Sequence, residues 1–320
     1  MKKILVTGSV GQIGSELTMA LRARYGNDNV VACGRKTKPS EKLLNSGPFE
    51  YIDITDKESV EKVVKKYEID TIYNMAAILS AAGEKNPLIC WDVNINGLYN
   101  ILEIAREFKL TRVFVPSSIA VFGPETPKKN TPQETILKPK TMYGITKVTG
   151  ESLGDYYFKK FGLDVRGMRY PGIISAETLP GGGTTDYAVE IFYEAIKNKK
   201  YTCFLKKDTV LPMMYMPDCI KATIDLMEAD LSKLKHHCDF NVASMSFSAG
   251  ELEDEIKKYI PDFICEYKPD FRQAIADSWP QSIDDSAARK EWGWKASYDL
   301  PAMTKDMIDK LTKRYKEGKL

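Results

Sequence analysis

The chain has 320 residues, long enough to form more than one hydrophobic core. Its 46 Lys and Arg residues nearly balance 44 Asp and Glu residues, which argues against a nucleic-acid or anionic-membrane surface. No apolar run reaches the roughly 18 residues of a transmembrane helix. An apolar segment follows Met1-Lys2-Lys3 directly, leaving no room for a signal peptide, so we expect a cytoplasmic protein.

Residues that could bind a transition metal are few and scattered. The six cysteines have no short spacing, and the only histidines, His236 and His237, are adjacent, so their side chains diverge. A zinc site needs several such ligands to converge. We therefore expect reduced thiols and no metal.

Short β-rich segments alternate with amphipathic helical segments in the first half of the chain. Strands are expected over 3–7, 30–33, 51–52 (the end of a third), 71–75, 113–116 and 165–170, and helices over 12–24, 57–67, 91–108 and 142–161. This alternation predicts an α/β fold with a Rossmann-type, doubly wound parallel sheet. Such sheets bind ligands at the carboxyl ends of their strands.

The pattern loosens after residue 171. We expect a dinucleotide-binding domain over 1–171 and a smaller α/β substrate-binding region over 172–320, parts of which fold back onto the sheet. Thr184, Thr185 or Asp186 would cap a helix ending near 199. The other expected elements are a Pro- and Met-rich turn over 211–218 leading into a helix to 229, a helix capped by Ser248, and helices over 286–292 and 301–315.

A glycine triplet follows the first predicted strand and opens the first helix. Gly8 permits a tight turn, Gly11 lets the backbone approach a phosphate, and Gly14 allows close packing of helix on sheet. With Gln12 and Ile13 between them, the helix N-terminus would bind the pyrophosphate of a dinucleotide. In this strand–turn–helix setting the triplet predicts nucleotide binding.

The end of the second strand lacks the acidic residue that usually binds the adenosine ribose. It reads Cys-Gly-Arg-Lys over 33–36. Arg35 could accept a 2′-phosphate, which would favour NADP, or stack on adenine, or face solvent. Asp53 and Ile54 end the third strand, where they would meet the adenine edge; Asp53 could instead cap the following helix.

Tyr143 and Lys147 lie one helical turn apart and share a face. A phenol has a pKa near 10, and a nearby cation together with oxidised nicotinamide could lower it by roughly two to three units. Tyr143 would then be a general base for oxidation of an alcohol. Ser117 and Ser118 follow the fifth strand; we favour Ser118 as the hydroxyl that binds the substrate oxygen, although the pair could simply stabilise a turn.

These residues together resemble the extended short-chain dehydrogenase/reductases over essentially the whole chain. The motifs that carry the resemblance are the glycine triplet, Asn-Met-Ala-Ala over 74–77, Asn94 within 93–97, the Ser–Tyr–Lys set, 169–174 and 285–294. The resemblance implies that Asn94 supports the active-site helix and a water relay. It also places Ala76, Ala77, Pro171 and Ile173 at the cofactor, the last two near the nicotinamide amide.

Within that group, three longer strings are similar to short-chain L-threonine 3-dehydrogenases. They span 179–188, 211–218 and 278–282. This resemblance implies metal-independent oxidation of the C3 hydroxyl of L-threonine to 2-amino-3-oxobutyrate, on the way to glycine, with NAD as the usual acceptor. Gly34 replaces the family's usual Asp, so NADP stays open.

The predicted substrate is a small amino acid. Thr184 and Thr185 would offer hydroxyl and backbone donors to its carboxylate. The resemblance adds Ser80 as a polar contact and Trp279 as a cover that excludes water; without it, a solvated serine and a core tryptophan would be the simpler interpretations.

Two other functions are weighed against threonine oxidation, and the sequence also bears on the oligomeric state. A nucleotide-sugar epimerase or dehydratase needs arginines for its substrate phosphates, and 211–218 contains none. A non-catalytic NAD(P)-sensing module would not need Tyr143, Lys147 and Ser118 together. The helices over 91–108 and 142–161 carry apolar residues beyond one face, which favours a homodimer through a helix bundle, unless all of them pack on the sheet.

Overall fold

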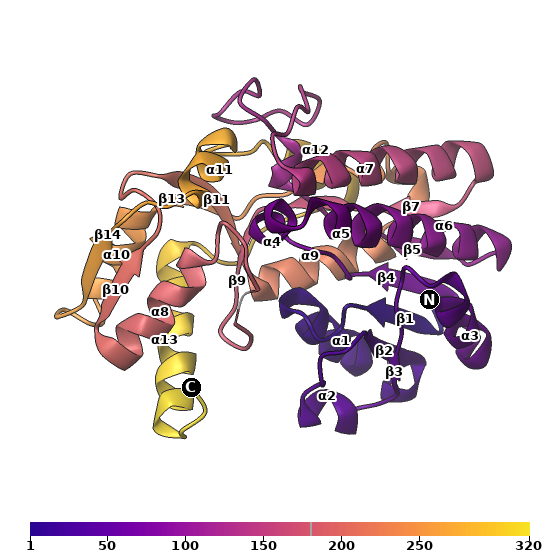
Figure 1. Cartoon of the computed structure of the whole chain (residues 1–320), viewed down its shortest axis with the longest axis horizontal. Coiled ribbons are helices and arrows are strands. Elements are labelled where there is room, and N and C mark those ends of the chain that lie inside the picture. The colour runs from indigo at the N-terminus through magenta and orange to yellow at the C-terminus, as the bar shows by residue number, and fades with distance from the viewer. Residues whose placement is uncertain (180) are drawn as a thin grey trace.

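The computed structural model describes residues 1–179 and 181–320; Pro180, part of the 179–188 string, lies outside the described residues. A six-stranded sheet with the order β3-β2-β1-β4-β5-β7 forms its centre, and all five pairings are parallel (Figure 1). Its strands are β1 (Ile4–Thr7), β2 (Val30–Gly34), β3 (Phe49–Tyr51), β4 (Thr71–Asn74), β5 (Arg112–Phe114) and β7 (Asp164–Arg166). The predicted Rossmann-type α/β fold is confirmed.

Both faces of this sheet are covered. Leu5 of β1 belongs to a core shared with α3, α6 and α7, whereas Ile4 and Val6 belong to a core shared with α1 and α9. Because successive side chains of a strand point to opposite faces, a strand buried on both sides is apolar throughout. The helices of this half are α1 (Gln12–Tyr25), α2 (Glu41–Asn45), α3 (Lys57–Tyr67), α4 (Ser80–Lys85), α5 (Pro87–Trp91), α6 (Gly97–Glu107) and α7 (Met142–Phe161), with 3-10 turns over Asn27–Asn29 and Ile119–Val121.

Two predicted elements of this half are each divided. The helix expected over 91–108 consists of the end of α5, a π-helical turn over Asp92–Asn96, and α6. The strand expected over 165–170 is broken at Gly167, where a Cβ would lie 2.2 Å from the Val115 carbonyl oxygen. Its second part, β8 (Met168–Tyr170), leaves the main sheet and pairs with β6 (Ser117–Ser118) and β12 (Phe240–Asn241).

The prediction of a turn over 211–218 was wrong. Those residues form β11 (Val210–Tyr215), between β13 (Met245–Ser248) and β9 (Gly172–Ile174), and the start of α9 (Met216–Glu228). Leu211 and Met213 enter one hydrophobic core and Met214 another, so the segment has the alternation of a strand despite its proline.

The remaining elements complete the second half. They are α8 (Tyr187–Asn198), α10 (Ala249–Lys257), α11 (Arg272–Ser278), α12 (Ser286–Trp292), α13 (Leu300–Lys316), a 3-10 turn over Leu231–Lys233, and the parallel pair β10 (Lys200–Cys203) and β14 (Ile264–Tyr267). Ser248 caps α10 in a reciprocal capping box with Glu251, as its sequence predicts.

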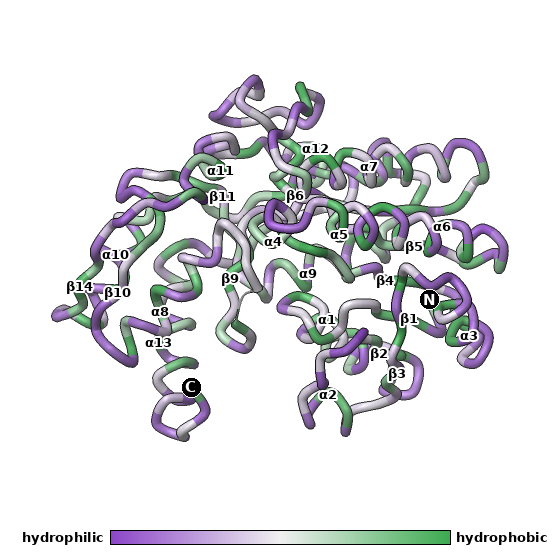
Figure 2. The backbone as a smooth tube through the Cα atoms, viewed as in Figure 1, coloured by the Kyte–Doolittle hydropathy of each residue, from purple (hydrophilic) through white to green (hydrophobic). Residues whose placement is uncertain are grey.

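Part of the second half of the chain packs on the six-stranded parallel sheet. Helix α9 lies against α1, and their side chains share a core with Ile4 and Val6. Figure 2 shows the hydrophobic strands of the centre in green and hydrophilic outer turns in purple. Among the described residues, no helix has both the length and the hydropathy needed to cross a membrane.

Candidate active site

A cleft lies at the carboxyl ends of the central strands, between the two halves of the chain. Its empty volume is about 1030 Å³, including space open to solvent. Most of the predicted site residues line it: Gly8, Gly11, Gln12, Ile13, Gly14, Ala77, Ser80, Ser118, Tyr143, Lys147, Pro171, Ile173, Thr184, Thr185 and Trp279. Segments up to about 270 residues apart thus meet at one site. Arg35, Asp53, Ile54, Ala76 and Asn94 are not part of its lining.

The glycine loop fits a pyrophosphate. Gly8 has a φ of +61°, and a Cβ on Gly14 would lie 2.3 Å from the Gly8 carbonyl oxygen, so larger residues do not fit. Helix α1 begins after Gly11 without a side-chain cap. The buried Gln12 Nε2 finds no hydrogen-bond acceptor among the described residues. Unpaired donors at a helix N-terminus suit an anionic phosphate.

The expected adenosine-binding residues lie beside the cleft rather than in it. Arg35 Nη1 is 3.4 Å from Asp53 Oδ2, and Asp53 Oδ1 accepts from the backbone N and the hydroxyl of Thr55. Burial alone would raise the Asp53 pKa, but these hydrogen bonds and the Arg35 charge hold it below its ordinary value. Asp56, not Asp53, caps α3. Ile54 is a core residue whose side chain packs against Gly97.

Tyr143 and Lys147 project from the first two turns of α7, which Thr141 caps. Lys147 Nζ donates to the Pro116 carbonyl at 2.7 Å and lies 5.4 Å from the centroid of the Tyr143 ring. Burial raises the pKa of Tyr143 to about 12, although the hydrogen bond of Ser118 acts to lower it. The predicted lowering required oxidised nicotinamide as well as Lys147, so it stays a prediction. Burial also lowers the pKa of Lys147 to about 8. Loss of hydration is the largest cause of both shifts, because burial disfavours the charged form of each group.

The two serines of β6 have different partners. Ser117 Oγ donates to the buried carboxylate of Glu151. Ser118 Oγ accepts from the backbone N of Ala120 at 3.2 Å, which leaves its own proton available to the cleft. The geometry therefore favours Ser118 as the hydroxyl that meets a substrate oxygen.

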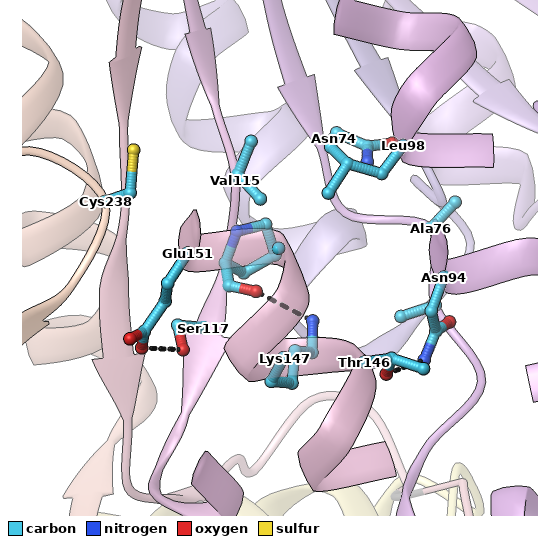
Figure 3. Close-up of a pocket in the computed structure, with 13 residues that line it drawn as sticks. Asn74, Ala76, Asn94, Leu98, Val115, Ser117, Thr146, Lys147, Glu151 and Cys238 are labelled. Carbon is cyan, nitrogen blue, oxygen red and sulfur yellow. Dashed lines mark hydrogen bonds between the residues drawn. The ribbon is translucent and has the colours of Figure 1, made fainter. Parts of the chain in front are cut away.

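A smaller cavity lies behind Lys147, with an empty volume of about 360 Å³ (Figure 3). Asn94, carried by the π-helical turn, accepts from the backbone N of Ile78 at 2.8 Å and donates to the Ile78 carbonyl and to Thr146 Oγ1. Asn94 thus fastens the segment after β4 to α7. Ala76 lines this cavity, together with Glu151, a residue that sequence reasoning missed. Glu151 lies one helical turn after Lys147 on the same face of α7, and this spacing could have pointed to it in the sequence.

The main cleft, in contrast to the smaller cavity, also has a polar part that is lined by hydroxyl groups. Ser80 Oγ and Thr184 Oγ1 are 3.3 Å apart, both buried, and the buried Trp279 lies on the same cleft. Asp186, rather than either threonine, occupies the N-cap position of α8, where its side chain makes no capping hydrogen bond, and it also lines the cleft. Sequence reasoning considered Asp186 only as a helix cap and missed its place in the site.

The comparison with protein families identifies the class of protein. Residues 4–243 match the NAD dependent epimerase/dehydratase family. The chain is 52% identical over 310 residues to an uncharacterised epimerase/dehydratase of Staphylococcus saprophyticus, with 97% of each chain covered. The chain therefore belongs to this family, the epimerase/dehydratase group of extended short-chain dehydrogenase/reductases.

Solved structures place the chain more narrowly. An L-threonine dehydrogenase from Clostridium difficile is 55% identical, with 98% of both chains covered and a TM-score of 0.95. A monomeric L-threonine 3-dehydrogenase from a metagenome is 53% identical, with 97% of this chain and 99% of that chain covered and a TM-score of 0.93. The resemblance to L-threonine 3-dehydrogenases is thus confirmed among structural neighbours. A UDP-glucose 4-epimerase of Thermotoga maritima, at 20% identity and a TM-score of 0.85, shares the fold.

Proposed function

We propose that this protein oxidises the C3 hydroxyl of L-threonine to 2-amino-3-oxobutyrate and passes the hydride to a nicotinamide dinucleotide. The observation that carries the proposal is one cleft in which the glycine loop, the Ser118–Tyr143–Lys147 set and a small hydroxyl-lined pocket meet. The names of the neighbours at 53% and 55% identity support the substrate.

In the proposed mechanism the chain positions the substrate and moves one proton. Ser118 donates to the C3 oxygen, and Tyr143, as phenolate, takes the hydroxyl proton. Thr184, Thr185 and Ser80 bind the substrate carboxylate, while Trp279 excludes water. Asn94, through Ile78 and Thr146, orients the surrounding segments.

Bound oxidised nicotinamide would supply the hydride acceptor and a positive charge. Gly8, Gly11, Gln12, Ile13 and Gly14 would hold the pyrophosphate. Beyond them, Ala77, Pro171 and Ile173 would line the path to the ring, and Lys147 would bind the nicotinamide ribose. Because burial raises the Tyr143 pKa to about 12, proton removal depends on added positive charge in this cleft.

The cleft argues against the epimerase alternative. Nucleotide sugars carry a diphosphate, which proteins commonly bind with arginine. Lys147 is the one basic residue that lines the cleft in the described part of the chain, and it donates to Pro116. A small zwitterion fits this lining better than a nucleotide sugar.

The direct test is absorbance at 340 nm with purified protein, L-threonine and either NAD or NADP at pH about 8. We expect reduction with NAD. Reduction with NADP alone would keep the reaction and make Arg35 the residue that selects the cofactor. No reduction with either, alongside turnover of a sugar nucleotide, would contradict threonine oxidation.

We also propose a homodimer formed through α6 and α7. Tyr99 and Tyr156 on these helices are about half exposed, and both lie against Tyr157. Exposed aromatic residues in one patch are typical of protein interfaces.

The double substitution Tyr99→Lys with Tyr156→Lys is expected to give a monomer in light scattering coupled to size exclusion, because it places charge in the patch. Ile264→Lys is the control and should keep the dimer, because Ile264 is an exposed residue of β14, which lies at the other end of the molecule in Figure 1. If the wild-type protein were itself a monomer, like the monomeric enzyme from the metagenome, the proposal would be contradicted.

A further inference from the structure

Trp279, which lines the cleft, lies at the point where α11 ends. A residue before a proline disfavours helical geometry, so Pro280 ends the helix and Trp279 is extended, with φ −93° and ψ 164°. The carbonyl groups in the last turn of a helix have no helical N–H partner. The segment that carries Trp279 is therefore a helix end that needs hydrogen-bond donors from another part of the chain.

Lys128 supplies those donors. Its Nζ donates to the Asp277 carbonyl at 2.8 Å and to the Trp279 carbonyl at 3.1 Å. A cation at the last carbonyls of a helix is favourable because it also meets the negative end of the helix dipole. Lys128 belongs to the segment 123–141, here called the strap, which leads directly into α7. In Figure 1 the strap forms the loop above α11 and α12.

The backbone of the strap holds the residues that follow Trp279. The Lys128 carbonyl accepts from the backbone N of Gln281 at 2.7 Å, and Thr131 pairs with Ile283 in a parallel bridge. Within residues 1–179 and 181–320, the hydrogen bonds of Lys128 Nζ are the ones that join the strap to residues 277–279. The side chain of Lys128 is thus the strap's own connection to the tryptophan segment.

The strap is firmly attached to the rest of the molecule. Gln133 Nε2 donates to the Asp239 carbonyl at 2.7 Å, and the buried Arg169 donates to the Gln133 carbonyl at 2.9 Å. Thr126 Oγ1 donates to the Ile136 carbonyl at 2.7 Å and so closes the strap on itself. Lys128 therefore projects from a fixed support toward the end of α11.

We propose that Lys128 is a positioning residue, which holds Trp279 over the cleft and thereby increases the affinity for substrate. This inference rests on the proposed threonine oxidation, in which Trp279 excludes water from the substrate. Without the ammonium group, the tryptophan segment would be closed for only a fraction of the time. A partly closed site binds with an affinity reduced by that fraction, whereas saturating substrate restores closure. Lys128 should therefore affect KM rather than kcat.

The kinetic test is the substitution Lys128→Met, which keeps the aliphatic stem and removes the ammonium group. KM for L-threonine is expected to rise about tenfold, the contribution of one charge-assisted hydrogen bond, with kcat within about threefold of wild type. Lys128→Arg, whose guanidinium can donate to both carbonyls, should restore most of the affinity. Lys129→Met, at the exposed neighbouring residue of the strap, is the matched control and should leave KM within about twofold.

Hydrogen exchange followed by mass spectrometry tests the same contact without turnover. Lys128→Met is expected to speed exchange about tenfold in a peptide that covers residues 275–282, because local opening becomes easier. Exchange in α7 should stay as in wild type, which would show that the fold is kept. Lys129→Met should leave both regions unchanged.

Three results would overturn the assignment. Unchanged exchange in Lys128→Met would show that the lysine does not hold the segment. Faster exchange with an unchanged KM would separate the segment from substrate affinity, and a loss of kcat that Lys128→Arg does not restore would indicate general damage. A wild-type protein that does not oxidise L-threonine would contradict the proposed function instead, and exchange would still decide whether Lys128 holds Trp279.

Discussion

Replacing Tyr143 with phenylalanine is expected to lower kcat for L-threonine by about 10²- to 10⁴-fold, the usual contribution of a positioned general base. The substitution removes only the phenolic oxygen from a buried ring, so α7 and its Thr141 cap should be unaffected. Turnover is measured at 340 nm, and NADH binding is followed by fluorescence. The dissociation constant for NADH should stay within about threefold because the glycine loop is unchanged.

Tyr315→Phe, on the exposed end of α13, is the matched control and should behave as wild type. Since burial raises the Tyr143 pKa to about 12, the wild-type rate should also increase with pH, because a larger fraction of Tyr143 is then ionised to the phenolate. The phenylalanine variant should lose this increase. Turnover within tenfold of wild type, with the pH dependence kept, would remove Tyr143 from the mechanism.

The sequence predicted the central fold well because its signals are local. The inner strands β1 and β2 are short, fully buried and mostly apolar runs, and the bounds expected for 57–67 and 142–161 are those of α3 and α7. Gly167 and the π-helical turn at Asp92–Asn96 escaped prediction. Their cause is tertiary: the close approach of Val115 to Gly167, and the hydrogen bonds that Asn94 makes to Ile78 and Thr146.

The same distinction between local patterns and tertiary contacts applies to the residues of the site. Residues in a recognisable local pattern, such as the glycine loop and the Tyr143–Lys147 pair, do line the cleft. The pKa of Tyr143 could not be predicted from its spacing to Lys147 alone, because its burial depends on residues far along the chain. Arg35 and Asp53 pair with each other, an interaction between two strand ends that spacing alone does not reveal.

A buried ion pair connects α7, the helix of Tyr143 and Lys147, to β8, the strand that pairs with the serine strand β6. Glu151 of α7 accepts two hydrogen bonds from Arg169 of β8, each 2.9 Å long, and a third from Ser117 of β6. Both charged side chains are at least 90% buried. Figure 3 shows Glu151 and Ser117 joined on one side of the small cavity, with Lys147 projecting from the same helix. The ion pair therefore joins α7 to β8, and the Ser117 hydrogen bond joins α7 to β6.

Replacing Glu151 with glutamine is expected to lower the free energy of unfolding by about 3–5 kcal/mol, because it leaves Arg169 buried without its main counter-charge. Urea unfolding measures the change. Asp155→Asn breaks the exposed Lys159–Asp155 pair on the same helix and should cost less than about 1 kcal/mol. A double substitution of Glu151 and Arg169 by leucine and methionine should recover most of the loss, since removing both charges leaves neither unpaired. A loss below about 1 kcal/mol for Glu151→Gln would show that Asp239, 3.7 Å from Arg169, is a sufficient counter-charge, and the Glu151–Arg169 pair would then have no special part in holding α7 in place.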